Sequence, residues 1–78
     1  MLTGKRFRLK QATLGIQSVE GQRTAVLIPA DDVVLVVSGP RPDDKRMVDV
    51  EWVNRRFVVF ADDLIDRGEE VNASASGT

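Results

Sequence analysis

The chain contains no cysteine, no histidine and no tyrosine, and these absences narrow the chemistry available to it. Without cysteine there is no disulfide and no thiolate metal site to hold the fold together. Without histidine the chain lacks the side chain best suited to proton transfer near neutral pH, which is also the commonest metal ligand. Stability must therefore come from hydrophobic burial and backbone pairing.

Long apolar runs and catalytic motifs are also missing. No stretch approaches the roughly 20 apolar residues of a membrane span, and the basic N-terminus has no apolar segment behind it that would make a secretory signal. Ser18 and Ser38 have no histidine to activate them, and no phosphate-binding or dinucleotide-binding loop is present. We therefore predict a cytoplasmic protein that is not an enzyme, with no catalytic residue, no cofactor, no metal and no membrane partner.

A chain of 78 residues supports one small domain with little material for a deep cleft. We expect a flexible N-terminus over residues 1–4, a single β domain over 5–71 and a disordered tail over 72–78. The net charge is −1, but residues 1–30 hold five cations against Glu20 alone, and the rest of the chain is acidic. This balance is not the strong basic excess that is typical of a nucleic-acid-binding domain.

Alternating apolar residues predict strands through most of the chain. Period two places Phe7 and Leu9 on one face of a strand, with cations on the other. A strand over 24–28 must end at Pro29 or lie at a sheet edge, since proline cannot donate a ladder hydrogen bond. The five consecutive aliphatic residues 33–37 predict a strand with both faces covered.

A tight hairpin and a helical turn are expected near the C-terminus. Asn54 tolerates the positive φ of a hairpin turn, and we expect Trp52 opposite Phe57 across it, with Val50 opposite Val59. After the hairpin, Asp63 is expected to cap one helical turn, Leu64 to enter the core and Gly68 to end the turn in the left-handed conformation. A short closing strand is expected over 69–71.

This order of elements resembles the SH3-like small barrels over residues 5–71, and most of all in the segment 48–64, where a hairpin runs into an acidic turn. The resemblance implies an all-β, five-stranded barrel with one helical or 3₁₀ turn near 62–67. The aromatic set with which SH3 domains bind proline-rich peptides is not matched, so that function is not carried over. Bacterial barrels of this general form bind proteins, nucleic acids or ligands. The chain's only aromatic residues are Phe7, Trp52, Phe57 and Phe60.

Several side chains admit both a functional and a structural interpretation. The cationic face of Arg6, Arg8 and Lys10 can contact phosphates, or it can be the solvated face of a protected edge strand. Trp52 can be an exposed stacking platform or part of the core. The aspartate pairs can hold a divalent cation, or they can serve turns and a helix cap. These pairs are Asp31-Asp32, Asp43-Asp44 and Asp62-Asp63.

We predict a non-catalytic module that binds another protein through the loop 38–45 and the hairpin tip 54–56, because loops on a rigid scaffold commonly carry function. The alternative is a nucleic-acid-binding barrel that uses the cationic strand face. A further alternative is a subunit that oligomerises to cover 33–37. The candidate contact residues are Arg6, Arg8, Lys10, Arg41, Lys45, Arg55 and Arg56.

Overall fold

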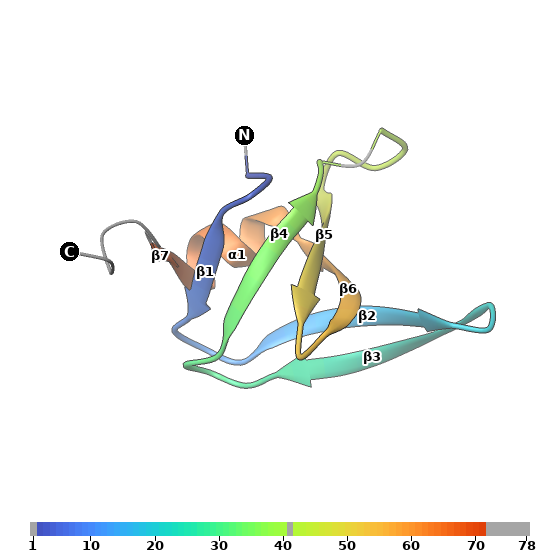
Figure 1. Ribbon diagram of the computed structural model, residues 1–78, viewed down its shortest axis with the longest axis horizontal. Coiled ribbons are helices and arrows are strands. Elements are labelled where there is room, and N and C mark those ends of the chain that lie inside the picture. The colour runs from blue at the N-terminus through green and yellow to red at the C-terminus, as the bar shows by residue number, and fades with distance from the viewer. Residues whose placement is uncertain (1, 41, 72–78) are drawn as a thin grey trace.

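The computed structural model describes residues 2–40 and 42–71, and within them it is an antiparallel β protein with one short helix (Figure 1). The expected disordered tail 72–78 lies outside the described residues. The elements are β1 (Arg6–Leu9), β2 (Thr13–Val19), β3 (Gln22–Ile28), β4 (Val33–Ser38), β5 (Met47–Trp52), β6 (Arg55–Phe60), α1 (Ala61–Arg67) and β7 (Gly68–Val71).

All strands belong to one seven-stranded sheet in the order β3-β2-β6-β5-β4-β1-β7. The all-β class is confirmed, but the prediction of a closed five-stranded barrel is wrong. The β2–β3 hairpin and the short β7 add strands at opposite ends of the sheet, and β3 and β7 do not pair with each other. The sheet therefore keeps two open edges, and the β2–β3 hairpin extends away from the other strands (Figure 1).

The core lies on one face of this sheet, which we call the inner face, and the opposite side is the outer face. Phe7 and Leu9 are both buried, as their alternation with cations predicted. Leu64 of α1 is fully buried against the same face, so the expectation that it enters the core is confirmed. The buried apolar cluster is Phe7, Leu9, Ile28, Val34, Val36, Val48, Val50, Phe57, Val59 and Leu64.

Strand β4 is covered on one face only, contrary to the expectation from its aliphatic run. Val34 and Val36 are buried, whereas Val33 is 43% exposed and Leu35 is half-buried on the outer face. The reason is that the short helix packs beside β1, β2, β6 and β7, and no other element of the described part of the chain covers the outer face of β4. The outer face therefore keeps apolar side chains in contact with solvent.

The β5–β6 hairpin forms, but the expected cross-strand register is wrong by two residues. Val53 and Asn54 both have positive φ and make a two-residue turn, so that Trp52 pairs with Arg55 and Val50 with Phe57. Trp52 and Phe57 are diagonal neighbours whose ring centroids lie 5.5 Å apart. The half-buried Trp52 packs against the core, and its indole Nε1–H donates a 2.9 Å hydrogen bond to Asp32 Oδ2.

The helix α1 begins and ends differently from the expectation. Its N-cap is Phe60, without a side-chain cap, because the chain passes directly from β6 into the helix; Asp63 lies inside the first turn. Gly68 is extended at φ −121° rather than left-handed, because β7 starts there. Its backbone N–H donates to the Leu64 carbonyl oxygen, which ends the helix and starts the strand at one residue.

Residues 2–4, which belong to the segment expected to be a flexible N-terminus, make contacts with the domain. Leu2 packs against the core, and the backbone N–H of Gly4 donates to the carbonyl of Val36 at 2.8 Å. The Thr3 hydroxyl donates to the Gly39 carbonyl at 3.2 Å. These contacts place the start of the chain beside the end of β4.

We predict that Gly68→Ala destabilises the fold, because an added Cβ would lie 2.8 Å from the carbonyl oxygen of Leu64. Urea denaturation should show a loss of about 1–3 kcal/mol in the free energy of unfolding. The matched control is Gly15→Ala, where the added Cβ meets the end of the Ile28 side chain at 3.1 Å, an atom that can move aside. A smaller loss for Gly68→Ala than for Gly15→Ala would contradict the account of the α1–β7 junction.

Candidate functional site

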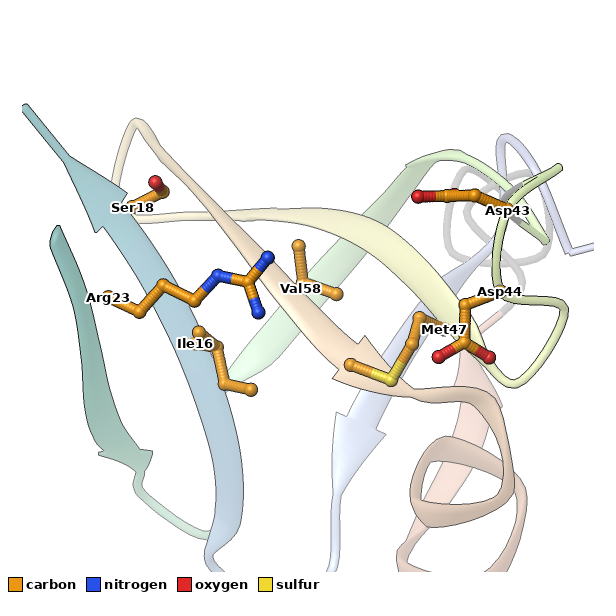
Figure 2. A pocket seen from close by; sticks show the side chains of 7 residues that line it. All are labelled: Ile16, Ser18, Arg23, Asp43, Asp44, Met47 and Val58. Atoms are coloured by element: carbon orange, nitrogen blue, oxygen red, sulfur yellow. The ribbon is translucent and has the colours of Figure 1, made fainter. Parts of the chain in front are cut away.

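A groove of about 270 Å³ lies between the β2–β3 hairpin and the segment 42–46, on the outer face of the sheet (Figure 2). We call it the outer groove. Its residues come from four strands and one loop that lie apart in the sequence and that the fold brings together. Its lining residues are Ile16, Ser18, Arg23, Asp43, Asp44, Met47 and Val58.

The floor of the outer groove is apolar because sheet register aligns outward-facing side chains there. Ile16 of β2 pairs with Val58 of β6, and both are half-buried. Met47 begins β5 on the same face and is 9% exposed. These three side chains offer a hydrophobic surface that a ligand's apolar group can cover.

One wall of the outer groove is formed by a turn that Asp44 organises. Its carboxylate oxygen Oδ1 accepts hydrogen bonds of 3.1 Å from both the backbone N–H and Nε of Arg46. The carbonyl of Asp44 accepts from the backbone N–H of Met47 at 3.1 Å. The hydrogen bond and the negative charge of Asp44 raise the pKa of Arg46 above its ordinary value. Hydrogen bonds within the segment 44–47 therefore hold the acidic wall in place and connect it to Met47 on the groove floor.

The opposite wall carries a cation, Arg23 of β3. Its side chain reaches across β2, and its guanidinium points into the groove toward Val58 (Figure 2). Within residues 2–40 and 42–71 the structure shows no ion pair for Arg23, unlike Arg8, Arg46 and Arg67. A groove cation that forms no ion pair within the described part of the chain can attract an anionic group from outside.

Exposed apolar side chains continue from the groove floor along the outer face. Leu14 and Leu27 pair across β2 and β3 and are 42% and 62% exposed. Phe60, opposite Met47 at the end of β6, is 38% exposed. Apolar surface that gathers next to a groove marks a contact site more strongly than scattered exposed residues do.

The predicted cationic face is present, but acidic residues of β7 accompany it. Arg6, Arg8 and Lys10 are all exposed, and Arg8 Nη2 donates to the carboxylate of Glu69, its cross-strand partner. Glu70 of β7 forms an ion pair of 3.5 Å with Lys5. The interpretation of these cations as edge protection is wrong, because β1 lies between β4 and β7 and is not an edge strand.

The two predicted contact segments lie at opposite ends of β5 (Figure 1). Lys45 is exposed in the loop before β5, and Arg41 lies outside the described residues. Arg55 and Arg56 are exposed at the other end, and Arg56 is opposite Glu51. The loop and the hairpin tip therefore do not form one continuous patch, and only the loop reaches the outer groove, through Asp43 and Asp44.

The lining residues that sequence reasoning did not assign to a binding site are Ile16, Ser18, Arg23, Met47 and Val58. One signal was available for part of this set. The two-residue turn at Glu20 and Gly21, both with positive φ, fixes the pairing of β2 with β3 and places Leu14 and Ile16 with Ala25 and Leu27 on one face. No local pattern indicates that β6 lies next to β2.

The described residues hold no group of three or more His, Cys, Asp or Glu side chains placed to bind a metal ion. At least one aspartate of each pair already has a protein partner. Asp32 accepts a hydrogen bond from Trp52, Asp44 accepts one from Arg46, and an Asp63 carboxylate oxygen lies 3.9 Å from Arg67 Nε. No helix among the described residues is both long and apolar enough to cross a bilayer.

Comparison with known proteins gives no further guide to the site. Neither a family model, nor a curated protein, nor a solved structure matches the chain. The arrangement of the outer groove is thus the basis for any functional inference.

We predict that Asp44→Ala loosens the turn that forms the acidic wall. Losing a hydrogen bond of about 1 kcal/mol to the backbone N–H of Arg46 should speed amide exchange at that residue about fivefold. The control is Asp66→Ala, an exposed carboxylate of α1. Unchanged exchange at Arg46 would show that Asp44 does not organise the wall.

Proposed function

We propose that this chain is a non-catalytic interaction module that binds a segment of another protein in the outer groove. The observation that carries the proposal is the combination of an apolar floor with the cation Arg23, which has no ion-pair partner within the described part of the chain. The chain has no histidine or cysteine, and in the groove the Ser18 hydroxyl has no histidine to activate it while the Asp44 carboxylate already accepts hydrogen bonds from Arg46.

The chemistry of the groove favours an extended peptide that carries an apolar side chain next to an acidic one. The apolar side chain would cover Met47, Ile16 and Val58, and burial of one such side chain contributes about 1.5–3 kcal/mol. The carboxylate would meet Arg23, whose planar guanidinium can bind it with two parallel hydrogen bonds. The exposed Leu14, Leu27 and Phe60 supply further apolar contacts beside the groove.

This proposal keeps one of the two segments predicted from the sequence at its centre. The loop 38–45 contributes Asp43 and Asp44 to the groove, whereas the hairpin tip 54–56 is a separate surface. Charge-reversal variants of the groove and of the hairpin tip can therefore show which of the two surfaces binds.

We predict that a random peptide library panned on the protein enriches sequences in which an apolar residue neighbours Asp or Glu. Adding one such synthetic peptide should shift the NMR signals of Ile16, Met47 and Val58. Arg23→Glu should weaken binding at least about tenfold, because it replaces the attractive charge in the groove by a repulsive one.

The matched control is Arg56→Glu, the same change of charge on an exposed side chain of the hairpin tip. This variant should bind the peptide with an affinity within about twofold of that of the native chain, since salt screens a charge far from the contact. If Arg56→Glu weakens binding and Arg23→Glu does not, the hairpin tip and not the groove is the binding surface. If the library enriches no such sequence and no peptide shifts the NMR signals of the groove, the interaction proposal fails.

A nucleic-acid-binding function remains the second candidate, and the exposure of Arg6 and Lys10 favours it. Neither side chain has an ion pair among residues 2–40 and 42–71, although Arg8 has one with Glu69. Glu69 and Glu70 lie beside these cations and would repel a phosphate backbone. Because Glu69 and Glu70 already form ion pairs with Arg8 and Lys5 on this face, we rank this candidate second.

We predict that a short single-stranded oligonucleotide, added at low salt, binds only weakly and shifts the NMR signals of β1 no more than those of the outer groove. If this second function is correct, shifts should instead concentrate at Arg6, Arg8 and Lys10, fall steeply as salt rises and disappear in an Arg6→Glu, Lys10→Glu variant. Affinity in the micromolar range at moderate salt, lost in that variant, would overturn our ranking.

A further inference from the structure

Strand β3 is an open sheet edge that lacks the usual protection. Among residues 2–40 and 42–71 it pairs with β2 alone; it lies at the end of the strand order and extends over Gln22–Ile28. Residues 22–25 and Leu27 are exposed. Arg23 is its one charged residue, and its proline follows only at position 29. Natural sheets commonly protect such an edge with charges, proline, bulges or short length, because an open edge accepts a further strand.

The opposite edge of the same sheet shows the contrast. Strand β7 has only the four residues Gly68–Val71, and two of them, Glu69 and Glu70, are acidic and exposed. A short, doubly charged strand discourages pairing with another chain. The lack of such features on β3 therefore distinguishes it within this molecule.

The ladder of the β2–β3 hairpin determines which backbone groups of β3 are available. A two-residue turn at Glu20 and Gly21 closes on the pair Val19–Gln22, from which hydrogen-bonded and non-hydrogen-bonded pairs alternate. Gln22, Thr24 and Val26 therefore hydrogen-bond to β2, and the N–H and C=O groups of Arg23, Ala25 and Leu27 point away from β2. These three residues present donors and acceptors along the open edge.

We propose that a second copy of this chain occupies this edge, with β3 pairing antiparallel to β3 about a two-fold axis at Ala25. In that register Ala25 faces its own copy, and Arg23 of each protomer faces Leu27 of the other. All three outward-facing residues then pair, which gives about six backbone hydrogen bonds. The proposal goes beyond the outer groove, since it concerns the edge of β3 and not the floor formed by β2, β5 and β6.

Sequence symmetry and charge favour this register over its neighbours. Centring the pair on Arg23 would place two like charges directly opposite each other, which is destabilising. Centring it on Leu27 would bring Pro29 opposite Ala25, and proline has no N–H to donate. In the Ala25 register no like charges meet, and Leu27, 62% exposed in the single chain, packs on the aliphatic part of Arg23.

The contact is small, so we expect a reversible dimer with a dissociation constant on the order of 100 μM. Sedimentation of the full chain should show the mass rising from the 8.6 kDa of one copy toward twice that value as concentration increases to about 1 mM. A mass that stays at 8.6 kDa at about 1 mM would overturn the proposal and leave the edge to a strand of a different protein.

The absence of native cysteine allows a direct test of the register. In Ala25→Cys the two thiols would sit on a hydrogen-bonded pair with Cα atoms about 5.5 Å apart, within the range of a disulfide. In the matched control Thr24→Cys the two Cα atoms would be diagonal neighbours about 7–8 Å apart, on the other face. Under mild oxidation Ala25→Cys should form the disulfide dimer at least about tenfold faster. Equal rates would overturn the proposed register.

A third variant separates pairing from folding. Ala25→Pro removes an N–H that points to the open edge, so it should leave the β2–β3 ladder and the circular dichroism spectrum intact. The same variant should stay monomeric at the concentration where the native chain dimerises. A folded Ala25→Pro that dimerises like the native chain would show that β3 is not the contact.

Discussion

The constraint on which the rest of this structure depends is that one sheet and one short helix must provide the whole core. A chain of this length buries only about 60% of the surface that its unfolded form exposes. The inner face takes Phe7, Val48, Val50 and Phe57, and Leu64 of α1 closes the cluster. Because α1 has seven residues and contacts β1, β2, β6 and β7, no other element within residues 2–40 and 42–71 forms a second layer.

The outer groove and the open edge of β3 both follow from that constraint. Side chains that alternate with the core residues must face outward, and here several of them are apolar, including Leu14, Ile16 and Val58. The hairpin of β2 and β3 extends away from the other strands, so within residues 2–40 and 42–71 its outer strand β3 has a partner on one side only (Figure 1). The groove uses side chains and the charge of Arg23, whereas the edge uses mainly the backbone donors and acceptors of β3. The side chains of Arg23 and Leu27 contribute to both surfaces.

Local pattern predicted the parts of this fold that local physics controls. Alternation identified β1 and β5 and the burial of Phe7 and Leu9, the aliphatic run 33–37 identified β4, and Pro29 marked the end of an edge strand. The predicted register of the β5–β6 hairpin was wrong because it was chosen to place Trp52 opposite Phe57. The turn geometry sets the register instead, since Val53 and Asn54 both have positive φ and form a two-residue turn. The groove was not predictable, because it depends on the pairing of Ile16 with Val58, residues 42 positions apart in the chain.

Amide hydrogen exchange along β3, measured residue by residue at two protein concentrations, tests the central claim of one sheet with an unprotected edge most directly. At low concentration the account predicts slow exchange at Thr24 and Val26, which pair with β2, and fast exchange at Arg23, Ala25 and Leu27. At high concentration the exchange of the last three residues should slow while that of Thr24 and Val26 changes little. Uniform protection along β3 at low concentration, or exchange at Ala25 that does not depend on concentration, would contradict it.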